Sequence, residues 1–205
     1  YQSPGQVTAE GDWSGAAFFL CAGALGGPVT VSGLTPRSSQ GDKAVADILR
    51  DMGAILSWNG DALTVSRGTL RAVTVDSAPI PDLIPVLVLT AACCQGESRF
   101  TNAGRLRLKE SDRLQSVCAG LRAIGGFAEE TADGVIVEGT NGFAGGRVDA
   151  CGDHRIAMAF AVAAAASQKP VTVCGAESAA KSYETFFQEY ERLGGKLTVE
   201  GGARV

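Results

Sequence analysis

The stretch GDWSGAAFFL, residues 11–20, decides the fold because its pattern returns twice along the chain. Asp12 precedes an Ala-rich helix that is apolar nearly all round. Asp82 and Asp153 precede two more apolar helices, so the three aspartates stand 70 and 71 residues apart. A fixed period of this kind is typical of a domain assembled from copies of one unit. Helices that are apolar on every side are expected in the core, covered by other elements.

Each copy adds further elements in the same order. A strand follows the apolar helix, and an amphipathic helix then ends at a glycine, the residue that best tolerates the left-handed conformation of a helix C-terminus. A hairpin follows, with NG at residues 59–60 in the first copy and DG at residues 133–134 in the second. In the third copy we expect the amphipathic helix from Ser182 to Leu193, with Leu193 facing inward, and a last strand over residues 196–199.

These patterns predict an α/β (α+β) fold built from three βαβαββ units. The units are expected over residues 6–70, 71–140 and 145–205, in one domain without a linker. Three buried helices would be enclosed by sheets and by the amphipathic helices.

Charge and hydropathy exclude several classes of function. The chain has 205 residues, with 18 basic and 22 acidic residues and a formal net charge of −4. It therefore has no broad positive surface for nucleic acid or an anionic membrane. Its longest apolar segments are shorter than the roughly 20 residues that span a bilayer. The chain begins at Tyr1 rather than Met, so we expect a fragment of a longer protein.

The six cysteines form no C-x-x-C pair, and most of them lie in apolar runs. We expect reduced thiols in a cytoplasmic protein, where Cys behaves as a small hydrophobe. A single histidine makes a zinc site with mixed ligands implausible. No metal or other cofactor is expected.

The densest cluster of charge is RLRLKESDRL, residues 105–114. The apolar period that follows predicts a helix beginning near Glu110 or Ser111. Lys109 and Arg113 would then lie one turn apart at its N-terminus, where they repel each other and oppose the helix dipole. A multiply charged anion would reverse this penalty. The alternative is a solvated helix start, with Glu110 and Asp112 neutralising the cations.

Two other helix starts carry cations. Arg155 stands in the first turn of an apolar helix, where it could bind an anion or pair with Asp153 or Asp12. Lys181 precedes the third amphipathic helix. Arg113, Arg155 and Lys181 together would form a trap for phosphate and carboxylate groups. His154 could carry a proton or could be a satisfied hydrogen-bonding group.

Other polar positions are interpreted as structural. Asp12 is expected to be an N-cap, a role that aspartate commonly fills. Residues 37–42, RSSQGD, have capping residues but no cluster of cations. The chain has no phosphate-binding glycine loop and no nucleophile beside a plausible base. Asp82, Lys109 and Glu110 remain as groups that could move protons.

Four motifs resemble the family of 5-enolpyruvylshikimate-3-phosphate synthases. The residues RLKESDRL at 107–114 and GDHRIAM at 152–158 are similar to its two signatures. IPD at 80–82 and AKSY at 180–183 follow the family's order. The resemblance implies an inside-out, barrel-like α/β domain of three βαβαββ repeats, of the enolpyruvyl transferase type. Family members have two such domains, and this chain resembles the C-terminal one, so the preceding half of the enzyme is expected to be absent.

The resemblance also implies a reaction. The enolpyruvyl group of phosphoenolpyruvate would pass to the 5-hydroxyl of shikimate 3-phosphate, with release of phosphate, in the pathway to aromatic amino acids. Asp82 would bind the ring that bears the hydroxyl and help to take its proton, and Lys109 would assist. Glu110 would donate a proton to the methylene carbon. The anion ligands for phosphoenolpyruvate would be Arg113, Arg155 and Lys181.

Partners and departures follow from the same resemblance. The missing N-terminal half would complete the site, and the full-length enzyme would be monomeric. Arg105 stands where some members have an asparagine that contacts the shikimate moiety, so this contact is left open. Glu184 stands where many members have proline, which affects only the local backbone.

Three rival functions remain from the sequence. The related enzyme that transfers enolpyruvyl to UDP-N-acetylglucosamine shares the fold, although the two signatures match the shikimate enzyme better. A non-catalytic domain that binds phosphate compounds belongs to another class, and the isolated chain could behave in this way. An RNA-processing enzyme of related repeats is disfavoured by the acidic balance.

Overall fold

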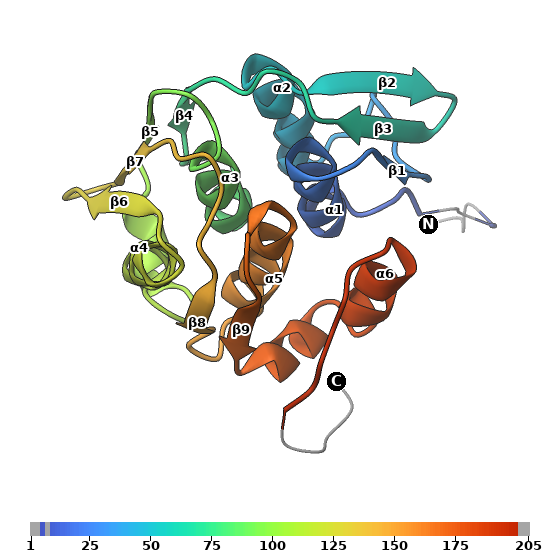
Figure 1. Cartoon of the computed structure of the whole chain (residues 1–205). Coiled ribbons are helices and arrows are strands. Elements are labelled where there is room, and N and C mark those ends of the chain that lie inside the picture. The colour runs from blue at the N-terminus through green and yellow to red at the C-terminus, as the bar shows by residue number, and fades with distance from the viewer. Residues whose placement is uncertain (1–4, 7–8, 201–205) are drawn as a thin grey trace.

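Three buried helices form the centre of the molecule, as the repeat predicts. The computed structural model describes residues 5–6 and 9–200. Figure 1 shows α1 (Trp13–Leu25), α3 (Ile84–Ala91) and α5 (His154–Ala163) side by side, with the sheets and the other helices around them. All three helices are almost completely buried. Each buried Phe or Leu of these helices contributes about 1.5–3 kcal/mol to folding, so this packing is a principal source of stability.

The second unit has the complete βαβαββ order. It runs through β4 (Thr74–Asp76), α3, β5 (Glu97–Thr101), α4 (Arg113–Ala123), β6 (Phe127–Glu130) and β7 (Val135–Glu138). The strands lie in the order β4-β5-β7-β6, and only β4 and β5 are parallel. The apolar helix therefore connects two parallel strands, as a crossover connection must.

The first unit repeats most of this topology. It contains β1 (Val29–Val31), α2 (Ala44–Asp51), β2 (Ile55–Asn59) and β3 (Ala62–Ser66). Their order β1-β3-β2 corresponds to β5-β7-β6 of the second unit, with all pairs antiparallel. The unit expected at residues 6–70 starts with a stretch of which residues 7–8 lie outside the described residues.

The third unit departs from the prediction. It contains β8 (Gly146–Asp149), which pairs in parallel with β9 (Val171–Cys174), and α6 (Phe186–Arg192). The strand predicted over residues 196–199 is not formed, because this segment pairs with no strand of the described residues. Leu193, predicted to face inward, is 43% exposed. The unit boundaries drawn from the sequence stay predictions.

Two helix starts were predicted too early. A 3₁₀ segment, η5 (Ala176–Lys181), and a turn that includes Glu184 precede α6, so this helix starts at Phe186 rather than Ser182. Helix α4 starts at Arg113, and η3 (Gly104–Leu108) precedes it. Lys181 and Lys109 precede these helices, as predicted, but by four residues or more rather than directly.

An aromatic cluster fastens the end of the chain to the first helix. The ring of Phe186 lies 5.2 Å from that of Phe19 and 6.0 Å from that of Phe18, between ring centroids. Tyr183 packs edge-on against both Phe19 and Phe186. These contacts hold η5 and α6 against α1, and so hold Lys181 near the N-termini of the buried helices.

All six cysteines are free, in agreement with the prediction of reduced thiols. Burial raises the pKa of Cys21 and Cys118 to about 12, so these thiols stay protonated and unreactive. Within the described residues, no helix is long and apolar enough to cross a membrane.

Candidate active site

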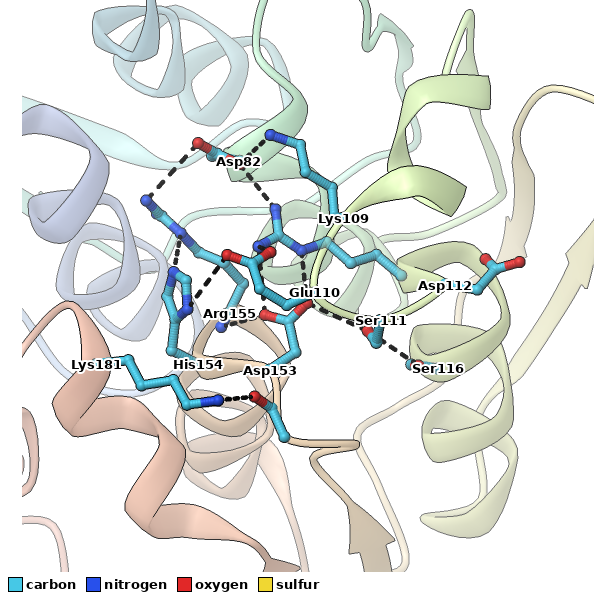
Figure 2. Close-up of polar contacts among 12 residues, drawn as sticks. Asp82, Lys109, Glu110, Ser111, Asp112, Ser116, Asp153, His154, Arg155 and Lys181 are labelled. Atoms are coloured by element: carbon cyan, nitrogen blue, oxygen red, sulfur yellow. Dashed lines mark hydrogen bonds and ion pairs between the residues drawn. The ribbon is translucent and has the colours of Figure 1, made fainter.

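One buried guanidinium joins three segments of the chain. Arg113, at the start of α4, is 1% exposed. Its Nε donates to Asp153 Oδ2 at 2.8 Å, and its Nη1 donates to Asp82 Oδ1 at 2.7 Å. Its Nη2 donates to Glu110 Oε2 at 2.7 Å and to Asp153 Oδ1 at 3.3 Å. Figure 2 shows the three carboxylates that accept these bonds, Asp82, Glu110 and Asp153, close to one another.

Asp153 is the fully buried partner of this guanidinium. Its carboxylate caps α5 by accepting from the backbone N–H of Arg155 at 2.8 Å, and it also accepts from the Ser111 hydroxyl at 3.2 Å. Burial alone would raise the pKa of Asp153, but the hydrogen bonds and charge of Arg113 outweigh it and lower the pKa. An ion pair between Asp153 and Arg155 was one alternative from the sequence, and Asp153 pairs instead with Arg113.

Asp82 lies close to two further cations, Lys109 and Arg155. It lies within a 3₁₀ turn, η2 (Pro81–Leu83), where its side chain caps no helix. Its carboxylate accepts from Lys109 Nζ at 3.2 Å as well as from Arg113, and Arg155 Nη2 lies 3.9 Å away. Burial opposes ionisation, yet the bond from Arg113 and the charge of Arg155 lower the pKa of Asp82. Asp82 is therefore ionised at neutral pH.

The start of α4 differs from the prediction for a local reason. Asp112 is the N-cap, because its Oδ1 accepts from the backbone N–H of Gln115 at 3.1 Å. Ser111, the other candidate, turns its hydroxyl toward Asp153 and also receives a bond from Ser116 at 3.3 Å. Lys109 and Arg113 therefore do not lie one turn apart on a helix, and both bind Asp82 instead of repelling each other. The sequence interpretation assigned Ser111 no contact.

Among the described residues, no carboxylate lies within hydrogen-bond distance of Arg155, and Asp82 is 3.9 Å away. Arg155 Nε donates to His154 Nε2 at 3.2 Å, and Arg155 Nη1 donates to the carbonyl of Ser14 at 3.4 Å. The guanidinium carbon lies 5.7 Å from the centre of the Phe18 ring. The predicted alternatives, ion pairs with Asp153 or Asp12, are not formed. Arg155 is thus positioned by the Phe18 ring, the His154 imidazole and the Ser14 carbonyl. Its guanidinium can still bind an anion.

His154 is neutral and has one unused nitrogen. Burial, followed by the charge of Arg155, lowers the pKa of His154 below its usual 6.5. Because Nε2 accepts a hydrogen bond from Arg155, the proton of the neutral ring is on Nδ1. Nδ1 is buried, makes no hydrogen bond to any described residue, and lies 3.8 Å from Glu110 Oε1. The prediction of a satisfied histidine is therefore wrong, since one ring nitrogen lacks a partner.

The remaining predicted residues lie around this cluster. Lys181 is exposed, and its Nζ donates to the carbonyl of Gly152 at 2.8 Å, beside Asp153. Asp12 caps α1 through the backbone N–H groups of Ser14 and Gly15, which confirms its structural role. Arg105 is exposed in η3, and its contact with a substrate stays an open question.

Residues 37–42 are mainly structural, as predicted, with one exception. Gln40 accepts from the first backbone N–H of α1, that of Trp13, at 3.0 Å. Asp42, however, lies where Arg155 and Asp82 affect it, and burial raises its pKa. The sequence interpretation missed this carboxyl, because only the packing of η1 (Gly41–Lys43) against α1 brings it near Arg155.

The arrangement is suited to binding anions and moving protons. Arg113 donates hydrogen bonds to three carboxylates of the chain itself. Each of the other three cations has at most one close carboxylate among the described residues: Lys109, Arg155 and Lys181. Among the described residues, no group of three or more His, Cys, Asp or Glu side chains could hold a metal ion. Asp82, Glu110 and His154 are the titratable groups next to these cations.

Comparison with known proteins shows the family of this chain. The family model for EPSP synthase (3-phosphoshikimate 1-carboxyvinyltransferase) matches residues 2–190. The chain is 43% identical over 190 residues to the 3-phosphoshikimate 1-carboxyvinyltransferase of Brachyspira hyodysenteriae, covering 92% of this chain and 45% of that protein. It is 41% identical over 194 residues to the protein of the same name from Methanocorpusculum labreanum, covering 95% of this chain and 46% of that protein.

Solved structures give the same result. An EPSP synthase from Acinetobacter baumannii superposes with a TM-score of 0.79 at 32% identity, over 94% of this chain and 47% of that one. The enolpyruvyl transferase NikO from Streptomyces tendae shares the fold, with a TM-score of 0.72 at 22% identity, over 93% of this chain and 44% of that one. The chain spans about half the length of these relatives. The chain belongs to the EPSP synthase family, and its fold is the inside-out α/β domain of enolpyruvyl transferases.

Proposed function

We propose that this chain is one half of an enzyme that transfers the enolpyruvyl group of phosphoenolpyruvate to the 5-hydroxyl of shikimate 3-phosphate and releases phosphate. One observation carries the proposal. The buried guanidinium of Arg113 binds both Asp82 and Glu110, and Lys109 and Arg155 lie against Asp82. The groups expected to move protons and those expected to bind anions therefore form one cluster. The names of the relatives support the same reaction.

The chemistry proceeds by addition and then elimination. Asp82 accepts the proton of the 5-hydroxyl, and the hydroxyl oxygen bonds to C2 of phosphoenolpyruvate while Glu110 donates a proton to C3. This gives a tetrahedral intermediate. Glu110 then takes back a C3 proton, which restores the double bond as the C2–O bond to phosphate breaks, and the proton held by Asp82 leaves with the phosphate. Lys109, which binds Asp82, stabilises the negative charge that develops on the 5-hydroxyl oxygen as it loses its proton.

The three cations proposed as anion ligands differ in the hydrogen bonds that must break before they can bind a substrate. Arg155 and Lys181 hold only a carbonyl or an imidazole within hydrogen-bond distance and are ready to bind a phosphate or carboxylate. Arg113 must release Glu110 first, because its Nη2 already donates to Glu110 Oε2. A substrate carboxylate that takes this Nη2 would leave Glu110 free beside His154 Nδ1, which is otherwise unpartnered. Binding of the anion and release of the proton donor are thus coupled.

The second half of the site comes from the rest of the enzyme in this proposal. The relatives are about twice as long as this chain, which supports a partner domain of similar size. Closure of the two halves would exclude water and bring the reacting groups into register. The free state of all six cysteines supports a cytoplasmic location.

The experiment is a phosphate-release assay on this chain, on a separately produced preceding half, and on their mixture. With phosphoenolpyruvate and shikimate 3-phosphate, we expect release only in the mixture. The matched control is the mixture containing Asp82→Asn, which should lose release while keeping the same circular dichroism spectrum. Release with UDP-N-acetylglucosamine instead of shikimate 3-phosphate would replace the proposed acceptor. No release with either acceptor, from two folded halves, would favour a binding domain.

A further inference from the structure

Arg107 makes a set of contacts that the proposed reaction does not use. Its Nη1 donates to Asp112 Oδ2 and to Glu130 Oε2, both at 2.9 Å, and its Nη2 donates to the carbonyl of Thr131 at 3.2 Å. The hydrogen bonds that Arg107 donates to Glu130 and Asp112 raise its pKa further. One guanidinium therefore joins the end of η3, the cap of α4 and the end of β6.

These contacts close a loop around two proposed catalytic residues. Asp112 uses one oxygen to cap α4 and the other to accept from Arg107. Arg107 and Asp112 are thus bound to each other at the two ends of residues 107–112, and Lys109 and Glu110 lie between them. The inner part of this loop has no apolar anchor, since Leu108 is 85% exposed.

The segment before the loop is also fixed to the second unit. The backbone N–H of Ala103 donates to the carbonyl of Asp133 at 2.6 Å, and Leu106 is buried. The carbonyl of Thr131 and the carboxylate of Glu130 then hold Arg107 on the same hairpin of β6 and β7. The hairpin is therefore the base on which the loop rests.

We propose that Arg107 is a positioning residue that sets the placement of Lys109 and Glu110 through Asp112, Glu130 and Thr131. This role rests on the proposed function. Arginine is suited to it because its planar fork can reach three acceptors at once, whereas a lysine ammonium has no such fixed geometry. The side chains of Arg107, Asp112 and Glu130 are each about one-third exposed, at 31%, 31% and 29%, so their ion pairs contribute little to stability. We therefore expect removal of the Arg107 side chain to lower the turnover rate rather than the free energy of unfolding.

The test uses the full-length enzyme with Arg107→Ala, Arg107→Lys and Glu130→Gln. The matched control is Arg99→Ala, which removes an exposed arginine paired only with Glu97. We expect Arg107→Ala to lower kcat about tenfold or more, because small misplacements of reacting groups are costly. The KM for each substrate should change less than about threefold, since uniform binding is not removed. Arg107→Lys should recover part of the loss, Glu130→Gln should lower kcat less than Arg107→Ala, and the control should match the parent.

Each other result would overturn the role. An unchanged kcat in folded Arg107→Ala would show that the loop holds its place without the guanidinium. A raised KM at unchanged kcat would make Arg107 a substrate ligand. A fall in kcat matched by a large fall in melting temperature would make it a structural residue. Failure of the parent enzyme to release phosphate would instead overturn the proposed function, and this role with it.

Discussion

At the scale of single residues, Arg113 and Asp153 decide how the site is held together. Both side chains are almost completely buried, and each satisfies the other. A buried pair is weak evidence of net stability, but removing one partner leaves an uncompensated charge. We expect Arg113→Met to lower the free energy of unfolding by about 3–5 kcal/mol in urea denaturation of this chain. Arg99→Met, at an exposed pair, should change it by less than about 0.5 kcal/mol. Equal effects of the two substitutions would contradict this account.

Asp153 also makes stability depend on pH. Its pKa is lowered in the folded chain, so its contribution is fully present above the unfolded pKa, about 3.9. The contribution is lost as pH falls from there through the folded pKa. Asp82 has the same sign. We expect the free energy of unfolding to fall steeply below about pH 4 in the parent chain and less steeply in Asp153→Asn. Parallel curves for the two chains would mean that Asp153 does not titrate in this way.

His154 offers a direct measurement, because it is the only histidine of the chain. Its pKa is lowered by burial and then by Arg155, and its Nε2 accepts from Arg155. Nitrogen-15 NMR of the imidazole should therefore show one titration with a pKa below 6.5 and the Nδ1–H tautomer above it. The folded state binds this proton less well than the unfolded chain does, so His154 lowers stability as pH falls below about 6.5. An Nε2–H tautomer would exclude the bond from Arg155.

At the scale of elements, the packing of α4 on α5 depends on one glycine. Gly120 lies in α4, and a Cβ placed there would come within 2.3 Å of the Phe160 ring, which is buried in α5. Gly→Ala in a helix normally stabilises by about 0.5–1 kcal/mol. Here we expect Gly120→Ala to destabilise by about 1–3 kcal/mol in urea denaturation, since overpacking outweighs propensity. Combining it with Phe160→Leu should recover part of the loss. A stabilised single variant would mean that the ring moves aside freely.

The elements also show which features can be predicted from sequence. The three apolar helices and both hairpins follow from local pattern, and the structure confirms them. The start of α4 could not be predicted, because Ser111 and Asp112 are both good caps and only the distant Asp153 decides between them. The strand expected at residues 196–199 has suitable residues but lacks a partner strand among the described ones. Strand propensity depends on such a partner.

The candidate site could be predicted only in part, because it too depends on contacts between distant segments. The repeat singled out Asp82 and Asp153 at corresponding positions, and these two residues meet at Arg113. The ion pairs of Arg113 with Asp82 and Asp153 could not be predicted, because they join segments that are some 30 and 40 residues apart in the sequence. Asp42 and Ser111 were missed because their side chains are ordinary capping residues until the fold brings them to the cluster.

At the scale of the whole molecule, the proposed site is half of what its substrates need. The four cations Lys109, Arg113, Arg155 and Lys181 face four carboxyl groups, those of Asp42, Asp82, Glu110 and Asp153, so the cluster has little excess positive charge. Phosphoenolpyruvate and shikimate 3-phosphate each carry a carboxylate and a phosphate, so together they bring about five or six negative charges. Under the proposed function, the remaining cations would come from the other half of the enzyme.

This imbalance predicts how the chain behaves alone. We expect the isolated chain to turn over at less than about one-hundredth of the rate of the two halves together, because positioning fails when ligands are missing. Phosphoenolpyruvate should raise its melting temperature only slightly at low ionic strength, and not at about 1 M salt, where charges are screened beyond about 3 Å. Arg155→Ala should remove the shift at low salt, while the exposed Arg99→Ala should keep it. In the combined halves, Lys109→Ala and Arg155→Ala should abolish turnover without unfolding the chain. Full turnover by the isolated chain would show instead that this half carries a complete site.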